Sequence, residues 1–140
     1  MTDDPLPLID HIARFCDRRY ISENDGVEPG VFMLRKDEEY LSVQWLERLG
    51  KSSRCDEIDG VRKILSQHLK IRSPSKIAVL NVGKTCEHVV QSSGWNIRML
   101  HKPEENNCAH AGIYDTNQDH ELIAELITET IQENSSCHLK

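Results

Sequence analysis

The stretch IAVLNV at residues 77–82 decides the fold that we expect for this chain. Five of its six residues are apolar, which is typical of a central strand buried on both faces of a sheet. Gly83 follows directly and turns the chain into a helix predicted around Cys86 to Gln91. Strands that alternate with helices in this way are typical of α/β proteins.

Downstream of this strand, the sequence predicts two more strand segments and a helix. Gly94 precedes a predicted strand at 97–101, and a polar loop at 102–107 leads to a short segment at 111–114. The last predicted helix covers 119–133, because its apolar residues recur at helical spacing. Its inward-facing residues are Leu122, Ile123, Leu126, Ile127 and Ile131.

Directly upstream of the strand, the sequence predicts a longer helix. Ser53 and Asp56 have the spacing of a capping box at its start. Apolar residues at helical spacing then continue to Leu69 and define one buried face.

The first 50 residues predict two strands and two short helices. Segments 31–35 and 40–43 predict the two strands of a hairpin. Ser42 is expected to cap a short helix that Gly50 ends, and the apolar spacing over 6–15 predicts another short helix.

Length and composition indicate a globular protein with a single domain. The 140 residues are enough for one core and predict one α/β domain over 1–140. We expect a compact sandwich with a central mixed sheet flanked by helices. There is no apolar run of about 18 residues and no basic-then-apolar leader, so we expect neither a membrane span nor a secretory signal.

Charge and cysteine content favour a cytoplasmic protein. With 17 basic and 23 acidic residues, the net charge is −6, which argues against a nucleic-acid coat protein. The five cysteines form no Cys-x-x-Cys pair, so we expect free thiols in a reducing compartment. The spacing of His101, Cys108 and His110 matches no established ligand pattern, and we expect no metal and no cofactor.

The turn after the decisive strand is a candidate anion site. Gly83 is followed by Lys84 and Thr85 at a helix start, where N–H groups and the helix dipole attract negative charge. A nucleotide-binding loop would need a glycine where Ala78 stands, so it is excluded. The alternative for Lys84 and Thr85 is a plain strand-to-helix turn.

Four polar residues near predicted strand ends are candidates for catalysis, namely His11, Arg35, His101 and His110. Open α/β sheets bind ligands outside the strand ends, where imidazole groups can move protons and guanidinium groups can hold anions. Convergence of His101 and His110 in one pocket with Arg35 or His11 would indicate a small enzyme.

Two blocks of like charge suggest interaction surfaces. The segment 60–86 has no acidic residue, and its basic residues are Arg62, Lys63, Lys70, Arg72, Lys76 and Lys84. The last predicted helix has an acidic stripe at four-residue spacing, made of Glu121, Glu125, Glu129 and Glu133. Repulsion along this stripe favours a basic neighbour, either the 62–72 helix or a partner, and the alternative is a solvated face.

Five segments together resemble a group of small bacterial proteins of uncharacterised activity. They are residues 11–16, 31–35, 40–47, 77–83 and 110–113. The resemblance spans most of the sequence and implies a bacterial cytosolic protein, with no particular activity. His11 followed by the Leu-Ser-Val stretch at 41–43 also resembles ADP-ribosyltransferase-like domains, although the glutamate of those enzymes has no located counterpart here.

These patterns favour a small interaction or ligand-binding protein, because this function requires no motif that the sequence lacks. A protein partner or a second copy of the protein would meet its charged faces. One alternative is a small enzyme, hydrolase or ADP-ribosyltransferase-like, at the His/Arg strand ends. The other is a nucleic-acid-binding accessory factor, which is disfavoured because only Trp95 is aromatic near the basic stretch.

Overall fold

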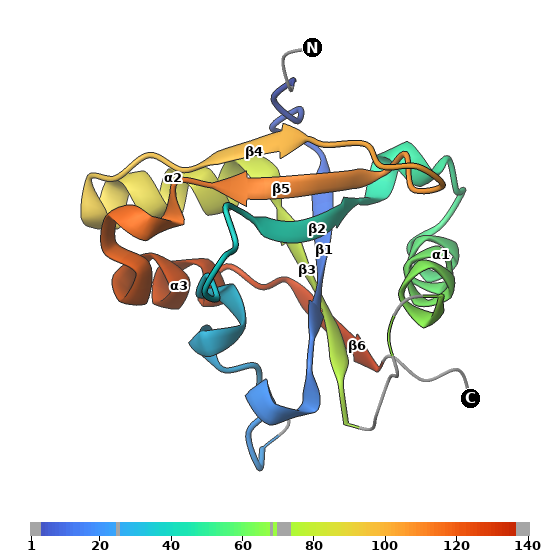
Figure 1. Cartoon of the computed structure of the whole chain (residues 1–140), viewed down its shortest axis with the longest axis horizontal. Coiled ribbons are helices and arrows are strands. Elements are labelled where there is room, and N and C mark those ends of the chain that lie inside the picture. The colour runs from blue at the N-terminus through green and yellow to red at the C-terminus, as the bar shows by residue number, and fades with distance from the viewer. Residues whose placement is uncertain (1–3, 25, 68, 70–73, 137–140) are drawn as a thin grey trace.

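The computed structural model describes residues 4–24, 26–67, 69 and 74–136, which fold around a six-stranded sheet (Figure 1). The strands are ordered β4-β5-β2-β1-β3-β6 in space, and each pair of neighbours is antiparallel. Their bounds are β1 (His11–Cys16), β2 (Leu41–Trp45), β3 (Lys76–Asn81), β4 (Arg98–His101), β5 (His110–Tyr114) and β6 (Glu133–Ser136). The α/β class is confirmed, whereas the expected mixed sheet is wrong, because no described pair of neighbouring strands is parallel.

Helices lie on both faces of this sheet. The α-helices are α1 (Arg54–Ser66), α2 (Val82–Ser93) and α3 (His120–Thr128), and the 3-10 helices are η1 (Arg18–Tyr20), η2 (Pro29–Phe32), η3 (Leu46–Leu49) and η4 (Thr116–Asp119). Helix α1 packs on one face, whereas α2, α3 and η2 pack on the other. Figure 1 shows α1 on one side of the strands, and α2 and α3 on the other.

Strand β3 is buried between these two helical layers. It lies between β1 and β6 in the sheet, and residues 77–80 have no exposed surface. Ile77 and Val79 pack in the cluster that includes α1, whereas Ala78 and Leu80 pack in the cluster that includes α2 and α3. The predicted buried strand is therefore confirmed, because its continuous apolar run covers both faces.

Local signals placed several element ends correctly. Ser53 Oγ accepts a hydrogen bond from the Asp56 N–H at 3.1 Å and caps α1. Gly50, with a φ angle of 68°, ends η3 as predicted, and Gly94, for which no helix end was predicted, ends α2 with a φ angle of 80°. This left-handed conformation suits glycine, which has no Cβ. The expected cap at Ser42 is wrong, because this residue lies inside β2.

The predicted helix over 6–15 is wrong, because residues 11–16 form β1. All six residues of β1 pair with β3. Ile12 and Cys16 pack on the face of α2 and α3, whereas Ala13 packs on the face of α1. Strand pairing thus buries side chains on both faces, and this outweighs the helical spacing of an apolar set that includes the exposed Leu8 and Ile9.

The predicted strand over 31–35 and its hairpin are also wrong. Pro29 begins η2, in which the Met33 N–H donates to the Gly30 carbonyl at 3.2 Å. Val31 and Phe32 are nevertheless buried, in the core beneath α3. Strand β2 pairs with β1 and β5 instead.

The predicted helix over 119–133 ends at Thr128, and β6 then follows. Ile123, Leu126 and Ile127 are buried as predicted, whereas Leu122 is 36% exposed. Strand β6 pairs with the outer edge of β3 and includes Glu133, the last residue of the expected helix. None of the helices among the described residues has the length and apolar character needed to cross a bilayer.

The sheet opens between β1 and β2. These strands pair only at Ile12 with Trp45 and at Ala13 with Gln44, whereas β1 and β3 pair along the whole of β1. In Figure 1, β2 crosses the upper end of β1 at a steep angle. This twist separates the two strands beyond Ala13, and side chains of both line the resulting opening.

Candidate functional site

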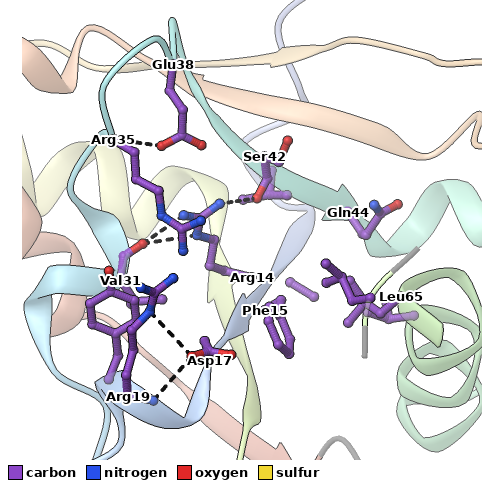
Figure 2. Close-up of a pocket in the computed structure, with 15 residues that line it drawn as sticks. Arg14, Phe15, Asp17, Arg19, Val31, Arg35, Glu38, Ser42, Gln44 and Leu65 are labelled. Carbon is purple, nitrogen blue, oxygen red and sulfur yellow. Dashed lines mark hydrogen bonds and ion pairs between the residues drawn. The ribbon is translucent and has the colours of Figure 1, made fainter. Parts of the chain in front are cut away.

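A cavity of about 290 Å³ lies where β1 and β2 diverge (Figure 2). Arg14 and Phe15 line it from β1, and Ser42 and Gln44 line it from β2. Helix α1 and the segment between β1 and β2 provide the other walls. Its volume is near the lower limit of small-molecule binding sites.

Arg14 spans the opening and ties its two sides together. Its Nε and Nη2 donate to the Val31 carbonyl oxygen at 3.2 and 2.8 Å, and its Nη1 donates to the Ser42 carbonyl oxygen at 2.7 Å. Burial lowers the pKa of Arg14, and the charge of Arg35 lowers this pKa too, whereas Cys16 and Glu38 raise it. Because burial disfavours the charged form of the Arg14 guanidinium, an anion bound beside this group would stabilise the charged form.

Arg35 reaches into the cavity beside Arg14 (Figure 2). Its backbone N–H donates to Glu38 Oε1 at 2.6 Å. Its guanidinium group forms no hydrogen bond or ion pair with any other residue in the described part of the protein. The cavity is lined by three arginines, Arg14, Arg19 and Arg35, and two carboxylates, Asp17 and Glu38, which gives it a charge of 3 − 2 = +1. This local excess contrasts with the net charge of −6 of the whole protein.

The opposite wall of the cavity is apolar and contains one polar atom without a partner. Phe15, Val61 and Leu65 line this wall, together with the exposed Leu69. The side chain of Gln44 is 7% exposed, and its Oε1 accepts no hydrogen bond from the described residues. A buried acceptor of this kind favours a ligand that brings an N–H or O–H donor.

His110 and Ser42 form a hydrogen-bonded pair at the edge of this site. The buried His110 ring places Nδ1 2.8 Å from the Lys102 carbonyl oxygen and Nε2 2.9 Å from Ser42 Oγ. Because a carbonyl oxygen only accepts, Nδ1 carries the ring proton and Nε2 accepts from the Ser42 hydroxyl. The Glu104 carboxylate lies 3.7 Å from Nδ1.

The other two histidine candidates lie away from the cavity. His11 Nδ1 is 2.7 Å from Glu47 Oε2, at the start of β1. His101 Nε2 is 2.7 Å from the Cys108 carbonyl oxygen. Since His101 pairs with Ala111 in the β4–β5 ladder, its side chain and that of His110 extend from opposite faces of the sheet and do not converge.

The first three backbone N–H groups of α2 already donate to other residues, so they are not available to an anion at the turn that carries Lys84 and Thr85. The N–H of Val82 donates to the Asp10 carbonyl and that of Gly83 to the Leu8 carbonyl, both at 2.9 Å. The N–H of Lys84 donates to Asn81 Oδ1 at 2.8 Å. Thr85 is buried, and its hydroxyl bonds to that of Thr130 at 2.7 Å. This geometry fits the plain strand-to-helix turn.

The described part of the basic stretch is divided between the two faces of the sheet. Arg62 and Lys63 belong to α1, and Arg62 pairs with Asp59 at 2.6 Å. Lys84 belongs to α2, which packs on the opposite face. Lys76 begins β3, whereas Lys70 and Arg72 lie outside the described residues.

The predicted acidic stripe is shorter than the sequence indicated, because α3 ends at Thr128. Glu121 and Glu125 are exposed on α3. Glu129 follows the helix and pairs with His88 at 2.7 Å. Glu133 lies in β6 and pairs with Arg54 at 3.2 Å. Since α1 and α3 pack on opposite faces of the sheet, Arg62 and Lys63 on α1 do not cover the acidic residues of α3.

The shortened stripe predicts the effect of Glu125→Lys. The new lysine would lie four residues from both Glu121 and Glu129, so two repulsive pairs would become attractive. We expect the free energy of unfolding to rise by about 0.5–1 kcal/mol at low salt, and the gain to shrink in high salt. Urea unfolding at two salt concentrations, with Glu125→Gln as the control, measures this.

Sedimentation of the same Glu125→Lys variant tests whether the acidic stripe binds a second copy of the protein or only faces solvent. If these glutamates bind a basic partner surface on a second copy, the variant loses self-association, most strongly at low salt. Reduced stability of the variant at low salt without a change in assembly would contradict the solvated face.

The cysteines in the described part of the protein give no sign of an activated thiol. Cys16, Cys55, Cys86 and Cys108 form no disulfide. Burial raises the pKa of Cys86 to about 11, so its sulfur stays protonated near neutral pH. Across the described residues, no three His, Cys, Asp or Glu side chains gather as a metal site would require.

The sequence analysis identified Arg35 and His110 but not Arg14, Ser42 or Gln44. Arg14 had a detectable signal, because it is a charged residue within an apolar stretch at 12–16. Assigning this stretch as a strand would have placed Arg14 on the same face as the buried Ile12. Ser42 and Gln44 have no such signal, since alternating polar residues are ordinary in a strand.

Comparison of the sequence and the fold with protein-family models, curated proteins and solved structures finds no match. The chemistry of the site is therefore inferred from the residues that line it.

Proposed function

We propose that this protein binds a small organic anion in the cavity between β1 and β2. This proposal keeps the ligand-binding function that the sequence favours. The observation that supports it most strongly is the pair Arg14 and Arg35, which share one cavity while neither guanidinium is bonded to a carboxylate of the described residues. Arginine holds carboxylate and phosphate oxygens through two parallel N–H donors, so these are the groups we expect at the polar end.

The lining of the cavity also suggests the other end of the ligand. Phe15, Val61 and Leu65 present an apolar wall that suits a short acyl group or one aromatic ring. Gln44 Oε1 would accept a hydrogen bond from a hydroxyl or amide of the ligand. The proposed ligand is therefore a carboxylate or phosphate monoester with an apolar body and one donor.

We further propose that the protein works in a reducing cytosol. The described cysteines are free, and two of them, Cys55 and Cys108, are exposed. Exposed thiols persist where glutathione keeps them reduced. Small metabolites with carboxylate or phosphate groups are abundant ligands in such a compartment.

Isothermal titration with inorganic phosphate and with phenylacetate tests the binding proposal. We expect Arg35→Ala to weaken binding about 10-fold or more, because a hydrogen bond to a charged group contributes about 1.5–3 kcal/mol. The matched control is Lys36→Ala, which removes a neighbouring exposed cation that does not line the cavity. Equal weakening by both variants would show a nonspecific charge effect, and it would overturn the proposal, as would failure of both probes to bind.

A further inference from the structure

We propose that Ser42 is a nucleophile for acyl transfer and that His110 is its general base. The hydroxyl oxygen and Nε2 are 2.9 Å apart, within the range for direct proton transfer between nucleophile and base. The Lys102 carbonyl holds the proton on Nδ1, so the lone pair of Nε2 faces Ser42. This arrangement of nucleophile, base and orienting acceptor is the one that serine hydrolases use on unrelated folds.

Ser42 and His110 differ in burial, and this difference fits their two proposed functions. His110 is 4% exposed, and its ring is held at both nitrogens, so its orientation is fixed before any substrate arrives. Ser42 is exposed, so a substrate can reach its hydroxyl. The Glu104 carboxylate, 3.7 Å from Nδ1, would stabilise the imidazolium that forms when His110 takes the proton.

Ser42 also lies between two hollows of the surface. It lines the arginine cavity and a more open hollow of about 310 Å³ whose other walls are residues 37–40. Its carbonyl oxygen faces Arg14 in the first hollow (Figure 2), while its hydroxyl bonds to His110. A substrate spanning both hollows would therefore pass the nucleophile.

The reaction that fits this geometry is ester hydrolysis in two steps. Ser42 Oγ attacks the ester carbonyl carbon while its proton moves to His110 Nε2, and the ester C–O bond then breaks as His110 protonates the departing alcohol. A water molecule next loses its proton to Nε2 and attacks the acyl-serine. Collapse of this adduct releases the carboxylic acid and returns the proton to Ser42 Oγ.

The substrate class rests on the proposed anion site. An acyl ester that also carries a carboxylate or phosphate group would place the anion at Arg35 and the apolar body against Phe15. We therefore infer that anionic esters react faster than neutral esters of the same leaving group.

The test is acylation of the full-length protein by p-nitrophenyl acetate, a neutral ester, followed by peptide mapping. We expect one acetyl group on Ser42 and a burst of p-nitrophenol. Ser42→Ala is expected to lower the rate by about 100-fold or more, as loss of a nucleophile with its base does. The matched control is Ser66→Ala, which removes an exposed hydroxyl whose one hydrogen bond to a described residue is to the Arg62 carbonyl.

Melting curves of the variants show whether a loss of acylation comes from a missing catalytic group or from a loss of folding. Ser42→Ala removes the hydroxyl that donates to Nε2 of the buried His110, so its melting temperature should fall by several degrees while the transition stays cooperative. His110→Gln should also lose acylation, and the folded Ser42→Ala variant decides the outcome if His110→Gln does not fold. Acetylation that maps to a lysine, or an unchanged burst in Ser42→Ala, would overturn the proposal.

A second ester separates this inference from the proposed anion site. p-Nitrophenyl hemisuccinate carries a carboxylate, and we expect it to acylate Ser42 about 10-fold faster than the acetate ester, an advantage that Arg35→Ala removes. Acylation of Ser42 by both esters at equal rates would keep the nucleophile and refute the anion site. Phosphate binding without acylation of Ser42 would keep the anion site and refute the nucleophile.

Discussion

Val79→Pro is expected to abolish cooperative folding. Val79 lies in the middle of β3, pairs with Ala13 on one side and Glu133 on the other, and has no exposed surface. Proline removes the backbone N–H that Val79 contributes to this ladder and brings a ring against the adjacent strand. The cost is about 3 kcal/mol or more, a large part of the stability of a domain this size.

Circular dichroism during heating measures this outcome, with Val79→Ala as the control. Alanine keeps the N–H and removes two methyl groups, which costs about 2 kcal/mol and leaves a cooperative transition at a lower temperature. A soluble Val79→Pro variant that melts cooperatively would refute the assignment of β3 as the buried central strand.

Arg14→Met is expected to lower the free energy of unfolding by about 2–4 kcal/mol. Methionine has a similar length but donates no hydrogen bond, so the Val31 and Ser42 carbonyls lose the donors that join η2 and β2 to β1. Relief from burying a charged guanidinium offsets part of this loss, because burial already lowers the pKa of Arg14. The same variant should no longer bind phosphate in the titration described above.

Urea unfolding of Arg14→Met, compared with Arg19→Met, isolates the contribution of the half-buried Arg14. Arg19 also lines the cavity, but its side chain is 60% exposed and its pairing with Asp17 at 3.4 Å is a surface contact. Its replacement should change stability by no more than about 1 kcal/mol. Equal or greater stability of Arg14→Met would show that the guanidinium does not hold the opening together.

The sequence was most informative where a local signal and the tertiary environment agree. The run at 77–82 identified a strand buried on both faces, since its four successive apolar residues at 77–80 fit such a strand. Ser53 and Gly50 marked a helix start and a helix end, because capping depends on a few neighbouring backbone groups. These features need no knowledge of distant residues.

The sequence misled where pairing with a distant strand outweighs local preference. Residues 6–15 have helical spacing of apolar side chains, yet residues 11–16 are a strand because β3, about 60 residues later, offers a full ladder of partners. The predicted C-terminal helix likewise ends early, and its last residue, Glu133, belongs to β6, which covers the outer edge of β3. Once that helix ends at Thr128, the acidic stripe that depended on it ends as well.

By itself, the sequence determined the α/β class, the buried strand β3, the N-cap of α1, the end of η3 at Gly50, and the negative charge of the protein. All of these follow from interactions among residues close in sequence, or from composition alone. Only the tertiary structure decided which polar residues meet. Arg14 and Arg35 share a cavity because β2 twists away from β1, and Ser42 meets His110 because β2 pairs with β5. Such contacts depend on strand order and on register, which no local pattern encodes. A register shift of one residue would move the side chains of a strand to the opposite face of the sheet.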